Sequence, residues 1–165
     1  MNLGLLLKLL HVLASFWFIA GLVGRGYSFW RAGRAKNVQE IHTLLGVSEF
    51  FERSAVIPGG TIVFLFGLLT AWLQRWPILG FLQGAASNWL LVSLVLYVGI
   101  SVVIGPLRLV QRRKQRDQAV EAALALGMVT PELTAAVNDK VVRTFRAVEF
   151  ITVVVIIVLM VAKPF

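Results

Sequence analysis

The stretch LGLLLKLLHVLASFWFIAGLV, residues 3–23, decides the fold because it is apolar apart from Lys8, His11 and Ser15. About 20 helical residues cross the roughly 30 Å of hydrocarbon in a bilayer, so this stretch is long enough to span a membrane. Outward from it, the chain holds three further apolar runs, at 56–73, 89–107 and 150–162. The last becomes long enough to span when residues 141–149 are added as its approach.

Composition places the whole chain in the membrane class. Hydrophobic residues make up 58% of the 165 residues and charged residues only 15%, which is too apolar for an ordinary soluble domain. We expect a single all-α membrane domain over residues 1–165, with four transmembrane helices in an antiparallel bundle. The expected spans are about 3–24, 56–75, 88–108 and 143–163, and the cytoplasmic segments with helical extensions are 25–55 and 109–142.

Charge sets the expected orientation, because loops rich in lysine and arginine stay on the cytoplasmic side. Basic residues crowd 25–53 and 108–146, whereas residues 77–87 between the second and third spans carry no charge. We therefore expect both termini outside the cytoplasm. The start Met1–Asn2 is not the basic region of a cleaved signal peptide, so the first span reads as retained. The net charge of +8 fits this topology and anionic headgroups at the cytoplasmic face better than a nucleic-acid site.

The two cytoplasmic segments show helical patterns. Apolar residues recur at helical spacing over 38–48, which indicates a short helix lying at the membrane interface. Gly127 suits the C′ position of a helix that leaves the third span, and Thr130 suits the N-cap of the next helix. That helix is expected to run from Pro131 through Arg146 into the fourth span. These segments either simply join two spans or form a docking surface for a partner.

Polar and small residues line up inside the predicted spans. At about 100° per residue, Lys8, His11 and Ser15 share one face of the first span. The third span carries polar residues at every fourth position, namely Ser93, Tyr97 and Ser101. The second span has a mostly small seam that allows close helix approach, made of Gly60, Phe64, Gly67, Ala71 and Gln74. We expect these faces to meet in the bundle interior.

His11 is the candidate functional residue, because an ionisable group inside a span faces the interior and is costly there. Three readings stay open: a structural hydrogen bond to a hydroxyl of Ser93, Tyr97 or Ser101, axial ligation of a haem, and a proton relay. His42 lies in a cytoplasmic segment and cannot supply a second ligand. The absence of cysteine excludes disulfides, iron–sulfur clusters and thiolate metal sites.

The other constellations are weaker. Arg146 and Glu149 are three residues apart and are expected to form a structural ion pair within one helix. The sequence offers no Ser–His–Asp arrangement, phosphate-binding glycine loop or histidine cluster. We therefore assign no catalytic residue and no metal site.

Three stretches carry a resemblance to known proteins: KLLHVLASFWFIAGLVGR at 8–25, SNWLLVSLVLYV at 87–98, and TFRAVEFITVVVIIVLMVAKPF at 144–165. Together they resemble a bacterial family of predicted integral membrane proteins of unknown function, DUF 2269. They resemble more distantly the HemJ-type protoporphyrinogen oxidases and the copper-resistance D-domain proteins. This resemblance implies a multi-pass protein of the bacterial inner membrane, and it puts the proposed haem b ligand of the HemJ-type family on His11.

The sequence departs from the HemJ-type pattern at two places. That family carries a lysine one turn after the third-span tryptophan, where this chain has Ser93 after Trp89, and Val148 replaces the asparagine before Glu149. Losing the lysine removes the most plausible acid–base group for protoporphyrinogen oxidation. The sequence therefore favours a non-catalytic accessory or scaffold subunit, bound to a membrane-protein partner or to further copies of itself, over a haem-binding redox protein.

Overall fold

The computed structural model describes residues 3–163, apart from the side chains of Val102, Pro106 and Arg108. Within this part the chain folds into helices joined by turns. Three helical stretches are long and apolar enough to cross a membrane, namely Leu3–Ala32, Val38–Leu73 and Pro131–Ala162. A fourth apolar stretch, Trp89–Ser101, is shorter. The expected all-α membrane class is confirmed, and by length the described residues support three spans.

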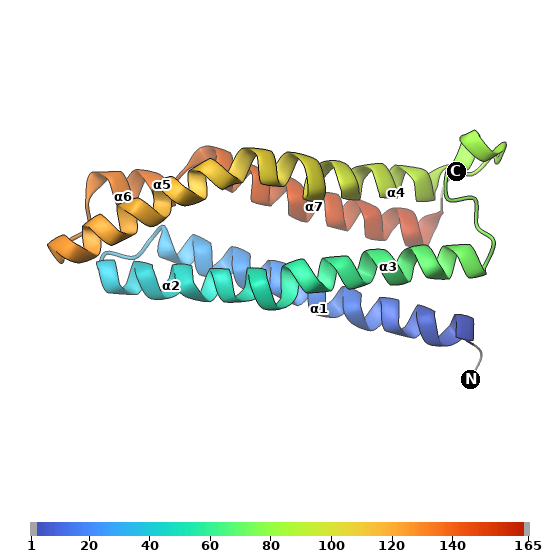
Figure 1. The fold of residues 1–165 in the computed structure, drawn as a ribbon, viewed down its shortest axis with the longest axis horizontal. Coiled ribbons are helices and arrows are strands. Elements are labelled where there is room, and N and C mark those ends of the chain that lie inside the picture. The colour runs from blue at the N-terminus through green and yellow to red at the C-terminus, as the bar shows by residue number, and fades with distance from the viewer. Residues whose placement is uncertain (1–2, 164–165) are drawn as a thin grey trace.

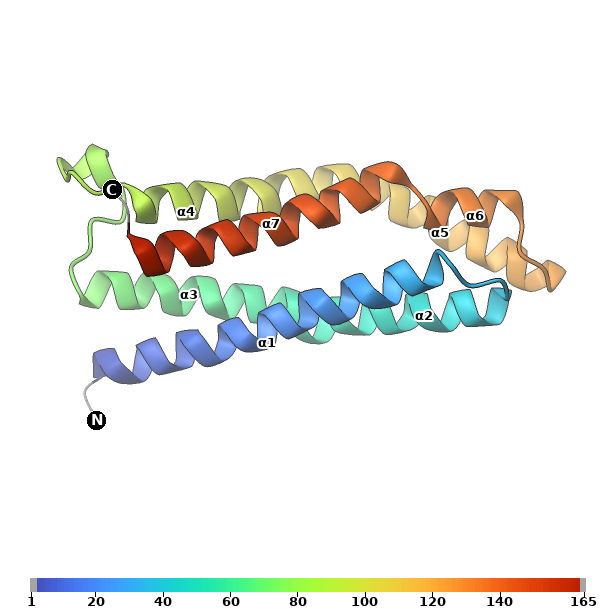
Figure 2. The same ribbon diagram turned by 180° about the vertical axis from the view of Figure 1, so that it is seen from behind.

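The helices form two elongated pairs (Figures 1 and 2). Their bounds are α1 Leu3–Ala32, α2 Val38–Phe51, α3 Ile57–Leu73, α4 Trp89–Tyr97, α5 Gly105–Leu126, α6 Pro131–Val137 and α7 Lys140–Ala162. The π-helical segments Glu52–Val56 and Val98–Ile104 let α2 continue into α3 and α4 into α5. In both views α1 runs beside α2 and α3, while α4 runs beside α7 and α5 beside α6. The connection between α3 and α4 includes the short 3₁₀ helix Gly80–Gln83.

Glycines allow α1 and the α2–α3 helix to cross closely. A Cβ added at Gly21 would lie 2.6 Å from the Ala55 Cβ, and one added at Gly59 would lie 3.1 Å from the Phe18 Cα. Such contacts require backbones that approach with no side chain between them. Phe18 is buried beside this crossing in a cluster with Leu22 and Val56.

At the end of the bundle where α1 finishes and α2 starts, the helices extend into a packed subdomain that we call the extension. Its buried core draws on the end of α1, on α2, on α5 and on α6, and consists of Phe29, Ala32, Val38, Ile41, Leu45, Val120, Ala123, Leu133 and Val137. Gly127 ends α5 with a φ of 69°, and the Thr130 side chain accepts a hydrogen bond from the Leu133 N–H. These two helix boundaries are confirmed.

Two helices of the extension differ from expectation. Rather than lying along the membrane interface, α2 continues into α3 and packs against α1. The helix expected from Pro131 through Arg146 is broken after Val137, because the Asp139 side chain accepts hydrogen bonds from the Val141 and Val142 N–H groups and starts α7 as its N-cap.

Candidate functional site

His11 lies half-buried on α1, against α3. Its Nδ1 is 2.9 Å from the Val63 carbonyl oxygen. Because a carbonyl oxygen only accepts, Nδ1 carries the proton and donates, and Nε2 is the basic nitrogen of the ring. A Cβ at Gly67 would lie 3.1 Å from the His11 Cε1. The small seam expected on the second span therefore accommodates the imidazole.

The hydroxyls expected to bind His11 make other contacts. The buried Ser93 Oγ donates to the Trp89 carbonyl oxygen of its own helix, at 2.8 Å. The Tyr97 ring stacks on Phe64 with 5.3 Å between ring centroids. The histidine's partner is thus a main-chain carbonyl on α3 rather than a hydroxyl on α4, and the hydrogen bond joins α1 to α3.

The remaining residues of the predicted polar interior lie apart. The Ser15 Oγ donates to the His11 carbonyl oxygen at 2.7 Å, so it bonds within α1. Ser101 is half-buried in the π-helical segment. Lys8 is exposed near the start of α1. The structure therefore does not bring these residues together around the imidazole.

A second polar group lies where the extension meets the bundle. Arg25 of α1 is only 5% exposed, and it pairs with Glu149 of α7 and, at 2.8 Å, with Glu52. Glu52 also pairs with Arg113 of α5 at 2.7 Å. Nearby, Arg116 of α5 is buried and pairs with Glu49 and Asp117, at 2.6 Å and 2.7 Å.

Arg146 takes a place in this network that the sequence did not predict. Glu149 pairs with Arg25 rather than with Arg146. The Arg146 guanidinium lies 3.8 Å from the Phe29 ring centroid, and its Nη1 is 3.5 Å from the Arg25 carbonyl oxygen. Because residues three apart on a helix can pair but need not, a partner from another helix with better geometry takes the carboxylate.

Sequence reasoning assigned Arg25 to the cytoplasmic loop and missed its burial. The signal was present in helical periodicity, because Phe18, Leu22 and Arg25 fall on one face of α1 and all three are buried. A buried arginine needs carboxylates beside it, and Glu52 and Glu149 supply them.

This chemistry suits a clamp between helices. The guanidinium–carboxylate pairs join α1, α5 and α7 to the segment between α2 and α3, and each buried charge has a partner of opposite sign or an aromatic face. In residues 3–163, no group of three or more His, Cys, Asp or Glu side chains could hold a metal ion.

Comparison with known proteins identifies the family of the chain. A family model described as a predicted integral membrane protein, DUF2269, matches residues 5–164. No curated protein and no solved structure matches the chain.

Proposed function

Because the chain belongs to the DUF2269 family of predicted integral membrane proteins, we propose that it is a non-catalytic accessory or scaffold subunit of a larger membrane complex. The observation that carries the proposal is the extension, which has a hydrophobic core of its own and is tied to the bundle by buried ion pairs. A preformed surface binds a partner without the entropy cost of ordering a flexible loop.

The tip of the extension is the surface we assign to the partner. Leu126 and Met128, at the turn between α5 and α6, are 65% and 62% exposed. Exposed apolar side chains at such a turn gain free energy when a partner covers them. Deleting the tip would also remove the buried residues Ala123 and Leu133, so point substitutions are the cleaner test.

Affinity purification in mild detergent tests this proposal. The wild-type protein should recover a stoichiometric membrane partner, and the double substitution Leu126→Glu with Met128→Glu should lose it. Gln118→Glu adds a carboxylate to an exposed position of α5 and should retain the partner. A wild-type protein that purifies as a monomer without any partner contradicts the scaffold function.

The span count and orientation belong to the same proposal. At 1.5 Å per residue, residues 89–107 extend about 28 Å, and they run beside α7, which is long enough to span (Figure 1). We propose that they form the fourth span in a bacterial inner membrane. The basic residues of 25–53 and 108–146 favour a cytoplasmic extension, with both termini on the opposite side.

One observation favours haem binding as a second candidate function. With Nδ1–H donated to the Val63 carbonyl, His11 presents Nε2 as its basic nitrogen, and metal-ligating histidines are commonly oriented by such a hydrogen bond. A haem held there would supply one-electron redox chemistry.

Absorption spectroscopy of the purified protein separates the two functions. Haem binding through His11 predicts a Soret band that His11→Ala loses and Ser93→Ala keeps. The structural role predicts no Soret band, a loss of about 1 kcal/mol of stability in His11→Ala, and little change in Ser93→Ala, because that hydroxyl bonds only within its own helix. A Soret band that His11→Ala retains in full excludes His11 as the ligand.

A further inference from the structure

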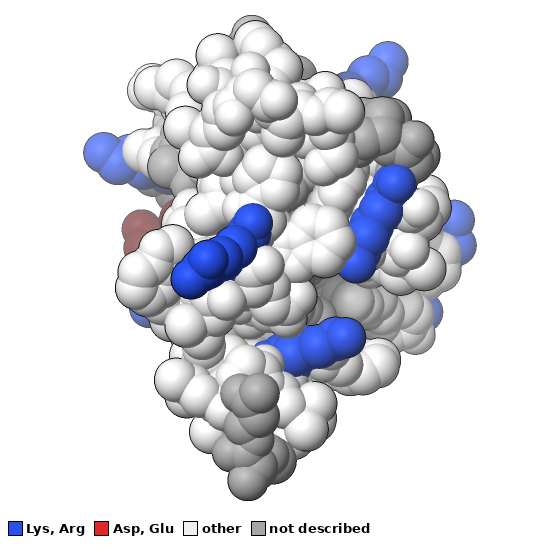
Figure 3. All heavy atoms as spheres, turned by 90° about the vertical axis from the view of Figure 1, so that its right-hand side faces the viewer, with Lys and Arg blue, Asp and Glu red and all other residues white. Residues whose placement is uncertain are grey.

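The charges of the protein are divided unequally between the two ends of the bundle. All eight acidic residues lie between Glu40 and Glu149, in the extension and in the ion-pair network beside it. The opposite end, where α1 starts and where α3 and α7 finish, carries three cations, Lys8, Arg75 and Lys163. We call it the acid-free end. Figure 3 views this end directly and shows basic side chains among uncharged ones on its near surface, with acidic atoms visible only at the left margin.

Two of these cations stand in an unusual backbone conformation. Among residues 3–163, the non-glycine residues with positive φ are Arg75, at 55°, and Lys163, at 45°. At the end of α3, the Arg75 N–H donates to the Trp72 carbonyl and the Trp76 N–H donates to the Ala71 carbonyl. This pair of bonds is a Schellman motif, in which glycine usually occupies the position that Arg75 holds.

The backbone strain at Arg75 costs more free energy than the interaction of its charge with the helix dipole provides. The left-handed conformation is unfavourable for a residue with a Cβ, and the favourable interaction of one exposed cation with the dipole at a helix C-terminus is smaller than that cost. Glycine would therefore suit the fold at least as well. The presence of an arginine at this positive-φ position therefore points to an interaction of its guanidinium outside the helix.

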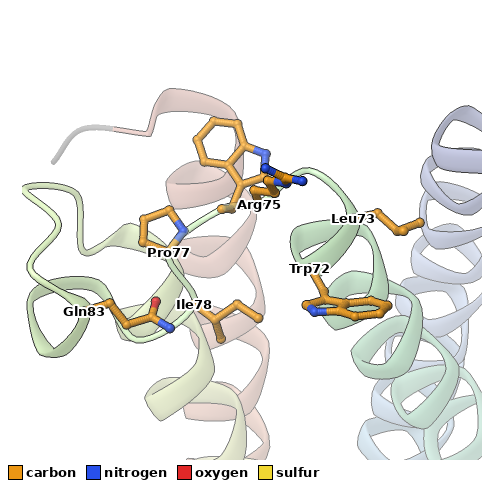
Figure 4. A pocket seen from close by; sticks show the side chains of 7 residues that line it. Trp72, Leu73, Arg75, Pro77, Ile78 and Gln83 are labelled. Atoms are coloured by element: carbon orange, nitrogen blue, oxygen red, sulfur yellow. The ribbon is translucent and has the colours of Figure 1, made fainter.

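Arg75 borders a hollow of about 680 Å³ at the acid-free end, lined by Trp72, Leu73, Arg75, Trp76, Pro77, Ile78 and Gln83. In Figure 4, the Trp72 indole projects from α3 on one side, and Pro77, Ile78 and Gln83 lie across from it on the connection to α4. The volume is in the range of ligand-binding pockets. The hollow thus combines apolar walls with a guanidinium.

The remaining two cations reinforce the positive charge here. The Lys163 Nζ lies 4.3 Å from the centroid of the Trp76 ring, which belongs to the lining of the same hollow. Lys8 lines a neighbouring hollow of about 400 Å³ that shares Leu73 with the first. An anion at Arg75 is therefore attracted by three cations, and among the described residues at this end it meets no Asp or Glu side chain.

We propose that this hollow binds an anionic phospholipid from the leaflet at the acid-free end, with its phosphate on Arg75 and the upper part of an acyl chain against Trp72 and Ile78. Arginine suits this role because its planar fork of N–H donors matches phosphate oxygens. The apolar lining of the hollow favours a lipid over free phosphate as the ligand. Trp72 is 69% exposed, and only a ligand with an apolar part gains free energy by covering it.

Native mass spectrometry of protein released from micelles with equal amounts of phosphatidylglycerol and phosphatidylcholine tests the proposal. The wild type should retain phosphatidylglycerol preferentially, and Arg75→Gly should retain about fivefold less, since one cation near a lipid phosphate contributes about 1 kcal/mol. Because glycine relieves the positive φ, Arg75→Gly should unfold at the same or a higher temperature in phosphatidylcholine alone. Lost lipid then cannot be attributed to lost fold.

Lys36→Gly is the matched control, because it removes one cation from the loop between α1 and α2 at the other end. It should leave phosphatidylglycerol retention unchanged. Equal losses in Lys36→Gly and Arg75→Gly, or equal retention of the two lipids by the wild type, overturn the proposal. Millimolar inorganic phosphate that raises the unfolding temperature as much as phosphatidylglycerol does would assign the hollow to a free anion and also overturn it.

Discussion

The hydrogen bond from His11 to the Val63 carbonyl of α3 depends on the absence of a side chain at Gly67. The imidazole donates to the Val63 carbonyl across the gap between α1 and α3, and it reaches that carbonyl because Gly67, one turn further along α3, has no side chain. A Cβ there would lie 3.1 Å from the His11 Cε1 and 3.3 Å from its Nδ1. The ring is rigid and half-buried, so it cannot yield without moving α1 or losing its hydrogen bond.

Gly67→Ala should therefore destabilise the protein, by about 1–3 kcal/mol, because an added methyl in a packed interface displaces its neighbours. Thermal unfolding in one detergent measures the change. Gly46→Ala is the control on the same long helical path, since nothing lies within 4 Å of a Cβ at Gly46. It should be neutral or stabilising by up to about 1 kcal/mol, as alanine is the better helix former. A stable Gly67→Ala protein would contradict the described position of His11.

At the scale of the helices, α7 depends on one carboxylate for its connection to α1. Glu149 is buried and pairs with Arg25. Glu149→Gln would leave the Arg25 guanidinium with Glu52 alone, and removing one partner of a buried pair costs about 3–5 kcal/mol. We expect a clear fall in unfolding temperature. Glu40→Gln, which removes an exposed pair with Arg31 at 3.6 Å, should cost less than about 1 kcal/mol. Equal effects would show that Arg25 is not clamped as described.

The Asp139 N-cap of α7 should make the stability of the protein depend on pH. Burial raises the pKa of Asp139, but the hydrogen bond from Arg112 and those from the Val141 and Val142 N–H groups outweigh it and lower the pKa below its ordinary value of 3.8. The stability from this cap is therefore fully present above pH 3.8 and is lost as the pH falls through the lowered pKa. Asp139→Ala should cost about 0.5–2 kcal/mol at pH 7. Wild type and variant should converge in unfolding temperature at low pH, and a constant difference would contradict this role.

The same helices show which local features the sequence could predict. Gly127 and Thr130 act over three or four residues, so their boundaries could be placed from the sequence. The break at Asp139 carried an equally local signal, an aspartate three residues before Val142, but the apolar run that follows made one continuous helix the simpler interpretation. The Val63 carbonyl that binds His11 leaves no sequence signal, because every residue has a carbonyl.

At the scale of the whole molecule, the sequence predicted the apolar stretches but not their pairing. The seam on α3 indicated where another backbone could approach, and it meets two neighbours: Gly67 faces His11 of α1, and Gly60 lies near both Phe18 of α1 and Tyr97 of α4. Small residues permit close contact between helices but do not determine which helix will pair with which. That choice depends on long-range contacts such as the Arg25–Glu149 pair, which joins residues far apart in the sequence.

Orientation in the membrane is the whole-molecule prediction. The chain holds no cysteine, so a single introduced cysteine reports one position without background. Lysine and arginine hold loops in the cytoplasm, and they crowd the extension, whereas the α3–α4 connection has no charge between Pro77 and Ser87. Cysteine at Ala125, exposed on α5, or at Ala35 should therefore react with an impermeant maleimide only in inside-out vesicles. Cysteine at Ala85 should react only in intact cells. Labelling of Ala85 solely from the cytoplasmic side would invert the topology, and it would place the acid-free end in the cytoplasmic leaflet.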